Sequence, residues 1–78
     1  MIEVYAIRSI HRKYIYVGIT NNIVRRLKEH NKGYNKKTKA YSPYELIYTK
    51  GFATRSEARK HEKFLKSGSG KEFLKTLQ

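Results

Sequence analysis

In its first half the chain changes from an alternating to a helical pattern of apolar positions. Residues 14–20 alternate aliphatic side chains with two tyrosines and a glycine, which is the period of a strand whose two faces differ. Ile23 and Leu27 then recur at a helical spacing, after candidate N-cap residues and before Gly33, which can end a helix. This stretch predicts a strand that leads directly into a helix over about residues 22–32.

The beginning of the chain alternates in the same way and predicts a first strand, joined to the second by a basic turn. A hairpin that pairs Tyr5 with Tyr16 collects the aliphatic residues on one face and the tyrosines on the other. In this register Glu3 lies opposite Gly18. The aliphatic face is the better core. The tyrosines are therefore expected on the more polar face, either as functional groups or as cross-strand packing residues.

The second half of the chain predicts one more strand and two more helices. Residues 44–49 alternate again and give a third strand, which Gly51 ends. A capping box begins at Thr54, ahead of apolar positions at a helical spacing. The Gly-Ser stretch 67–70 breaks this helix, as a simple turn or as a small phosphate site. A second capping box, beginning at Ser69, leads into a last short helix.

These elements predict one domain over residues 1–78, in the α/β (α+β) class: a three-stranded antiparallel β-sheet flanked by helices, in the order β-β-α-β-α-α. A hydrophobic content of 38% allows only a small core. The absence of cysteine excludes a disulfide, a thiolate nucleophile and a cysteine-based zinc site. No apolar run approaches the ~20 residues that cross a membrane, and the start of the chain is unlike a signal peptide. A cytoplasmic location is expected.

The charge balance is strongly positive, with 18 Lys and Arg against six Glu and a net charge of +12. Self-repulsion at this level opposes folding, so the charge indicates a polyanionic partner. Nucleic acid is favoured over an anionic membrane surface because no long amphipathic basic helix is predicted. The scattered glutamates also argue against a two-metal site built from several carboxylates. An enzyme with this sequence is expected to hold at most one metal ion.

Residues 31–42 combine basic and aromatic side chains without apolar periodicity, and they predict a mobile basic loop. Lysines suit phosphates and tyrosines suit base stacking, so the loop is a candidate nucleic-acid-binding segment. A solvated connector has nearly the same composition. The candidate binding residues are Lys32, Lys36, Lys37, Lys39, Tyr34 and Tyr41.

Two adjacent arginines on the first predicted helix have different neighbours. Arg25 has Glu29 one turn away, which indicates a solvated ion pair. Arg26 lies in a row with His30 and has no carboxylate at that spacing. A guanidinium matches the geometry of phosphate, so this difference favours Arg26 over Arg25 as an anion-binding residue.

Glu62 occupies an inward position of its predicted helix, where an acidic side chain needs an explanation. One explanation is a rim residue that pairs with Lys66, one helical turn away. The other is a functional carboxylate. Spacing alone leaves both interpretations open.

Five of these residues, in their order and spacing, resemble the GIY-YIG endonuclease family: Tyr5, Tyr16, Arg26, His30 and Glu62. The two tyrosines are 11 positions apart, the arginine follows the glycine of the second motif by eight positions, and the histidine follows the arginine by four. The first motif reads Glu-Val-Tyr and the second Tyr-Val-Gly, where the family has Gly-Ile-Tyr and Tyr-Ile-Gly. The resemblance covers nearly the whole chain, and within the family the chain is most similar to small standalone members.

The resemblance implies a role for each of the five residues. Glu62 is implied as the ligand of one Mg²⁺ or Mn²⁺ ion, and Arg26 as a contact of the scissile phosphate. Tyr5 or Tyr16 is implied to activate the attacking water, with His30 assisting. A tyrosine with a pKa of ~10 is a poor base at neutral pH, but nearby cations are expected to favour its phenolate.

The sequence therefore favours a metal-dependent DNA endonuclease that nicks with structural or weak selectivity. Its partner is expected to be DNA, with RNA as a further possibility, and no membrane or small-molecule cofactor is expected. The main alternative is a non-catalytic nucleic-acid-binding module of the same fold, and a third is a basic protein associated with RNA or ribosomes. Oligomeric state and substrate structure stay open.

Overall fold

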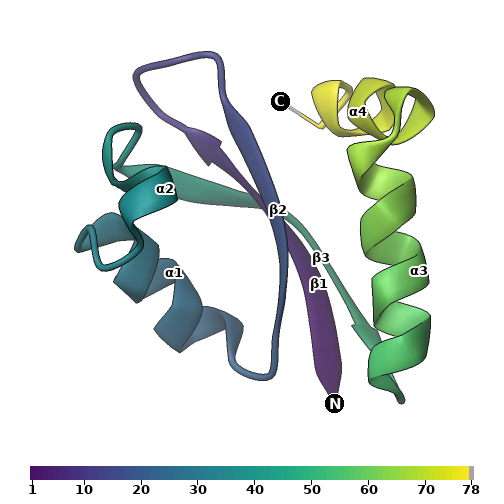
Figure 1. Cartoon of the computed structure of the whole chain (residues 1–78). Coiled ribbons are helices and arrows are strands. Elements are labelled where there is room, and N and C mark those ends of the chain that lie inside the picture. Colours follow the sequence, from purple (N-terminus) through teal and green to yellow (C-terminus); the bar gives the residue numbers. More distant parts are fainter. Residues whose placement is uncertain (78) are drawn as a thin grey trace.

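The computed structural model describes residues 1–77, which form a three-stranded antiparallel sheet in the spatial order β2-β1-β3 with helices on both faces (Figure 1). The elements are β1 (Ile2–Ser9), β2 (Ile15–Thr20), α1 (Ile23–Asn31), α2 (Lys36–Lys39), β3 (Tyr44–Phe52), α3 (Arg55–Lys66) and α4 (Gly68–Lys75). The predicted order of strands and helices is confirmed, with the short α2 added. In this part of the chain no helix is both long and apolar enough to cross a bilayer.

The β1–β2 hairpin is shifted by two residues from the predicted register. Tyr5 lies opposite Gly18, and Tyr16 lies opposite Ile7. The pairing of Tyr5 with Tyr16 is therefore wrong, as is that of Glu3 with Gly18, because Glu3 pairs with Thr20. The turn causes the shift, since a backbone hydrogen bond between residues 9 and 14 closes the hairpin there. A shift of two keeps every side chain on its predicted face.

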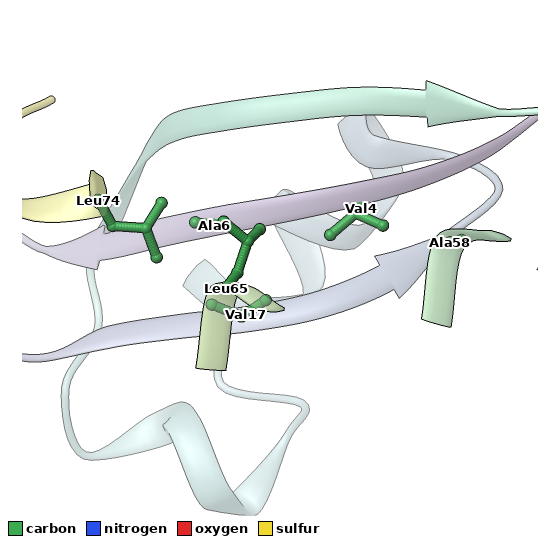
Figure 2. Close-up of a cluster of buried hydrophobic side chains, with 6 residues drawn as sticks. All are labelled: Val4, Ala6, Val17, Ala58, Leu65 and Leu74. Atoms are coloured by element: carbon green, nitrogen blue, oxygen red, sulfur yellow. The ribbon is translucent and has the colours of Figure 1, made fainter. Parts of the chain in front are cut away.

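Helices α3 and α4 cover the aliphatic face of the sheet and form the first core (Figure 1). Figure 2 shows its buried side chains, which are Val4, Ala6, Val17, Ala58, Leu65 and Leu74. The two leucines are 0% and 1% exposed. Truncating either to alanine would cost about 2–5 kcal/mol, because the surrounding atoms collapse only partly into the space. This core fixes α3 against the strands.

Helix α1 covers the opposite face and builds a second core there, so this face is not the polar surface that the sequence predicted. Tyr5 and Ile7 are 1% and 0% exposed. Ile23 and Leu27 of α1 pack against them, together with Tyr44 of β3. The helical stripe predicted for α1 is what removes the tyrosine face from water.

β3 contains an irregularity that the alternating pattern did not reveal. Ala6 pairs with Tyr48, while the next residue of β1, Ile7, pairs with Leu46. One extra residue on β3 therefore lies between these two pairs, as in a β-bulge. Tyr48 consequently packs with the first core and Tyr44 with the second. Strict alternation over residues 44–49 would place both tyrosines on one face, and the extra residue places them on opposite faces.

The junction between α3 and α4 is shorter than predicted. Ser67 ends α3 and also caps α4, with its hydroxyl accepting a hydrogen bond from the Gly70 amide at 3.2 Å. The predicted cap at Ser69 is therefore wrong. Gly70 is buried, and a Cβ there would overlap the carbonyl oxygen of Phe64. The glycine lets the two helices meet closely, and the stretch 67–70 serves as a helix junction.

Candidate active site

Three aromatic rings meet at the second core, one each from β1, β2 and α1. They belong to Tyr5, Tyr16 and His30, and we call them the tyrosine cluster. The Tyr5 and Tyr16 centroids lie 6.2 Å apart, and the His30 ring lies 5.9 Å from the first and 5.0 Å from the second. Tyr5 and His30 are fully buried, whereas Tyr16 is partly exposed. Only one of the two tyrosines can therefore face a bound substrate directly.

A chain of hydrogen bonds fixes the His30 ring. The Tyr5 hydroxyl lies 2.9 Å from Nε2, and the Thr38 hydroxyl of α2 lies 2.9 Å from Nδ1. Because Thr38 donates its own proton to the carbonyl oxygen of Asn35, at 3.4 Å, it accepts from Nδ1–H. This arrangement leaves the lone pair of Nε2 to accept a hydrogen bond from Tyr5. Thr38 thus sets the tautomer of a neutral His30.

Burial controls the ionisation of both partners. Burial raises the pKa of Tyr5 to about 12, against the lowering effect of the Arg26 guanidinium. The expectation that nearby cations favour a phenolate is therefore wrong for Tyr5. Burial also lowers the pKa of His30, and the positive charge of Arg26 lowers it further. At neutral pH both groups are uncharged, and their hydrogen bond is between neutral partners.

Both arginines of α1 pair with Glu29, so the predicted Arg25 pair is present and Arg26 has a partner that was not predicted. Arg26 forms the shorter contact with Glu29, with 3.0 Å between guanidinium and carboxylate, and Arg25 lies 4.0 Å away. The expectation that Arg26 has no carboxylate partner is wrong, because a spacing of three residues on a helix also places side chains together. Arg26 is the less exposed of the two, at 33% against 59%. The Glu29 carboxylate holds its guanidinium beside Tyr5.

Gly18 makes room for the tyrosine cluster. A Cβ at this position would lie 2.7 Å from the Tyr5 hydroxyl oxygen and 3.1 Å from Cε2 of Tyr16. Side chains do not approach that closely, so a residue larger than glycine would push the rings apart. The glycine of the second motif is needed because the Tyr5 ring crosses the neighbouring strand.

Glu62 projects from α3, on the opposite side of the sheet from α1. Its carboxylate is 18% exposed and lies 3.2 Å from the Lys66 ammonium, so the predicted ion pair is present. Its negative charge is also one of the causes that raise the pKa of Tyr5. Lys66 and Tyr16 line the same surface groove. Glu62 is therefore paired with a lysine, and it is near enough for its charge to act on the Tyr5 hydroxyl.

Comparison with known proteins agrees with this geometry. The profile of the GIY-YIG catalytic domain matches residues 1–76. The chain belongs to the GIY-YIG family. Members of this family are nucleases.

Individual relatives of this GIY-YIG chain are small bacterial proteins. A UPF0213 protein of Bacillus licheniformis is 45% identical over 58 residues, which cover 73% of this chain and 60% of that protein. A UPF0213 protein of Oceanobacillus iheyensis is 37% identical over 65 residues, covering 82% and 76%. The solution structure of the UPF0213 protein BH0048 from Bacillus halodurans superposes with a TM-score of 0.55 at 31% identity, covering 100% of this chain and 86% of that one.

The donor atoms of this GIY-YIG domain suit one hard cation with few protein ligands. Within residues 1–77, no group of three or more ligating side chains gathers as a metal cluster. Glu62 offers a single carboxylate, whose charge acts on Tyr5 of the tyrosine cluster. Mg²⁺ commonly keeps several waters and takes one or two carboxylates together with substrate phosphates. A single carboxylate together with substrate phosphates is compatible with one Mg²⁺ or Mn²⁺ ion.

Residues 31–42 are not the mobile loop that the sequence predicted. α2 lies within them, and its Thr38 is 0% exposed beneath His30. Tyr41 stacks on Tyr14 with 4.3 Å between centroids, and the Tyr44 hydroxyl donates to the Thr38 carbonyl oxygen at 2.8 Å. The segment is held by aromatic packing and hydrogen bonds, which composition does not reveal.

The candidate binding residues of this segment therefore separate into two groups. Tyr41 is a packing residue, only partly exposed. Tyr34 is 73% exposed and lines a shallow depression of about 430 Å³ on α1 with Lys32. The remaining members are exposed lysines on α2: Lys36, Lys37 and Lys39. Their role in binding nucleic acid stays a prediction.

Proposed function

We propose that this domain is a metal-dependent DNA endonuclease that hydrolyses phosphodiester bonds. The single observation that carries the proposal is the tyrosine cluster, in which a buried Tyr5–His30 pair supports a partly exposed Tyr16. The charges of Arg26 and Glu62 both act on Tyr5 of this cluster. The family supplies the nuclease class. A net charge of +12 supports a nucleic-acid substrate.

The two tyrosines have different roles in this proposal. Tyr16 is the catalytic tyrosine, because its ring is partly exposed and it lines the surface groove. Its hydroxyl orients the attacking water. Tyr5 is a positioning residue, because a buried hydroxyl with a pKa of about 12 does not give up its proton at neutral pH. Its hydrogen bond with His30 keeps both rings in place beside Tyr16.

Arg26 is the residue that contacts the scissile phosphate. Its guanidinium is 33% exposed and held by Glu29, so it can donate to a phosphate oxygen without much loss of side-chain freedom. As the water oxygen bonds to phosphorus, charge grows on the non-bridging oxygens, and Arg26 stabilises that charge. The bond to one bridging oxygen then breaks, and that oxygen takes up the proton that the attacking water releases. A metal ion on Glu62 would supply further positive charge to the phosphate and acidify water.

The main alternative is a non-catalytic nucleic-acid-binding domain of the same fold. Two observations favour it: Lys66 already neutralises Glu62, and Tyr5 is held in its protonated form. Neither excludes catalysis. An exposed lysine–carboxylate pair is worth only about 0–1 kcal/mol, so Lys66 can give way to a cation.

Nicking assays test the proposal. Purified protein is incubated with supercoiled, linear and branched DNA in Mg²⁺, in Mn²⁺ and in EDTA. We expect cleavage in at least one metal and none in EDTA. Arg26→Ala should lower the rate by about 10²-fold or more, while the matched control Arg25→Ala keeps it within a few-fold. DNA binding without any cleavage in either metal would favour the non-catalytic alternative.

A further inference from the structure

A groove of about 930 Å³ runs between the β1–β2 hairpin and the C-terminal helices. Six basic residues line it, three from the hairpin and three from α3 and α4: Arg8, Arg12, Lys13, Lys66, Lys71 and Lys75. We call this feature the basic groove. None of its lining residues is acidic, although acidic residues occur elsewhere in the chain. The sequence did not reveal it, because the two walls are about 50 residues apart along the chain.

We propose that the basic groove binds an unpaired DNA strand and leads it to Tyr16, so that the domain selects DNA with a single-stranded segment next to the cut. This inference rests on the proposed nuclease function and names its substrate class. It follows from three properties of the groove: its charge, its apolar floor and its connection to the tyrosine cluster.

The charge of the groove is available for phosphates. Arg12, Lys13 and Lys71 form no ion pair with another residue of the described chain. The other three are paired with carboxylates, Arg8 with Glu45, Lys66 with Glu62 and Lys75 with Glu72. The two lysines of these pairs are more than half exposed, so the pairs are weak and can exchange for phosphate.

The floor of the groove is apolar and aromatic. It includes Tyr14, Ile15, Tyr16 and Leu74. Tyr41 stacks on the Tyr14 ring, with 4.3 Å between centroids, and this contact restrains the ring. A duplex turns its phosphates outward and keeps its bases paired inside, so it cannot contact such a floor. An unpaired strand can lay its bases on aromatic rings while cationic walls follow its backbone.

The groove also leads to the proposed catalytic residues. Tyr16 belongs both to its lining and to the tyrosine cluster. Lys66 belongs both to its wall and to the ion pair with Glu62. A strand that follows the groove therefore passes the residues that would hold the metal and the water. Flaps, forks and bubbles have such a strand beside a duplex.

Metal-free binding measurements test the groove separately from catalysis. Lys13→Ala/Lys71→Ala removes one unpaired lysine from each wall. Lys60→Ala/Lys63→Ala is the matched control, since it removes the same charge from exposed positions of α3 outside the groove. Affinity for oligothymidine and for a duplex of equal length is measured in EDTA by fluorescence anisotropy over a range of salt. Melting temperatures confirm that both variants fold.

We expect the groove variant to lose affinity for oligothymidine on the order of tenfold at 0.1 M salt, with a salt slope smaller by about 1.4, or 0.7 for each contact. Its affinity for the duplex should fall no further than that of the control. Equal losses for both DNA forms would overturn the selection of an unpaired strand, and equal losses in both variants would overturn the groove. The binding assay contains no metal and does not depend on cleavage. A failure to cleave DNA in the nicking assay would therefore count against the proposed nuclease function but would not affect the binding result for the basic groove.

Discussion

The hydroxyl of Tyr5 and Nε2 of His30 lie 2.9 Å apart in the interior, and this hydrogen bond joins the central strand to α1. Thr38 extends the connection to α2 through Nδ1 of the same ring. All three residues are at most 1% exposed. A polar chain of this kind is stabilising only while every member keeps its partner, so its loss is measurable at either end.

Conservative replacement of the two tyrosines should separate positioning from catalysis. Tyr5→Phe keeps the ring but leaves Nε2 of buried His30 without a partner, which should cost about 1–3 kcal/mol of unfolding free energy. Tyr16→Phe should cost no more than about 0.5 kcal/mol, because this partly exposed side chain packs through its ring, which phenylalanine keeps. Urea unfolding gives both values, and nicking assays give the rates.

The losses of cleavage rate in the two variants should follow the opposite order to their losses of stability. Tyr16→Phe should lower cleavage more than Tyr5→Phe, measured well below the melting temperature of either variant. Full cleavage by a folded Tyr16→Phe variant would return Tyr16 to a packing role. Equal stability losses in the two variants would contradict the network around His30.

Acid should destabilise the domain through His30. Burial and Arg26 lower its pKa below the ordinary 6.5, while Glu29 acts in the opposite direction. As the pH falls below about 6.5 the unfolded chain takes up a proton at His30 before the folded chain does, so the free energy of unfolding decreases. The other groups that face the ring are the hydroxyls of Tyr5 and Thr38 and the rings of Tyr16 and Tyr44.

His61 shifts in the same direction, because burial and Lys50 lower its pKa. Chemical unfolding between pH 5 and 8 is therefore compared for the wild type and His61→Gln. Continued loss of stability in acid by His61→Gln assigns the effect to His30. A flat profile for this variant would show that His30 does not contribute.

Local patterns predicted much of this fold, because strand alternation and helix caps are properties of neighbouring residues. Thr54 caps α3 as expected, and Asn22 caps α1 at the predicted start of that helix. The hairpin register was wrong because the turn, and not the tyrosine pair, decides it. Thr38 was missed because a single threonine among lysines has no periodicity, and its partner His30 is eight residues away. The basic groove required the tertiary fold.

For the site residues, the spacing of the motif positions identified which side chains meet. It did not reveal their ion-pair partners or their burial. The sequence predicted Glu29 as the partner of Arg25 because the two are four residues apart. In the structure Glu29 lies closer to Arg26, which is three residues away. The pKa of Tyr5 depends on burial by α1, which alternation along a strand does not report. Ionisation is therefore the part of the site that sequence reasoning predicts least well.

Gly18 should be intolerant of even one added methyl group. In Gly18→Ala the new Cβ meets the Tyr5 ring, which His30 holds in place, so we expect a cost of about 1–3 kcal/mol in urea unfolding and slower cleavage. Gly68→Ala is the matched control, because a Cβ there meets nothing within 4 Å. Gly18→Ala should cost less in a Tyr5→Phe background, where the closest contact atom is absent. Equal costs in both backgrounds would show that the hydroxyl is not the obstacle.

The two interpretations of Glu62 lead to opposite results for a single substitution. If Glu62 only pairs with Lys66, Glu62→Gln should cost no more than about 0.5 kcal/mol and leave cleavage intact, since a pair with an exposed lysine contributes little. If it holds the metal, glutamine keeps the shape but offers a hard cation no charge. We expect the second result: cleavage in Mg²⁺ or Mn²⁺ collapses while the melting temperature changes little.

Metal-free DNA binding by Glu62→Gln should stay level or rise slightly, because one negative charge beside the basic groove is removed. Glu72→Gln is the matched control, since Glu72 also pairs with a lysine, Lys75 at 3.4 Å, and is 76% exposed on α4. It should leave cleavage unchanged in the same buffers. Nicking at the wild-type rate by folded Glu62→Gln would remove Glu62 from catalysis, and a matching loss in Glu72→Gln would assign the effect to surface charge.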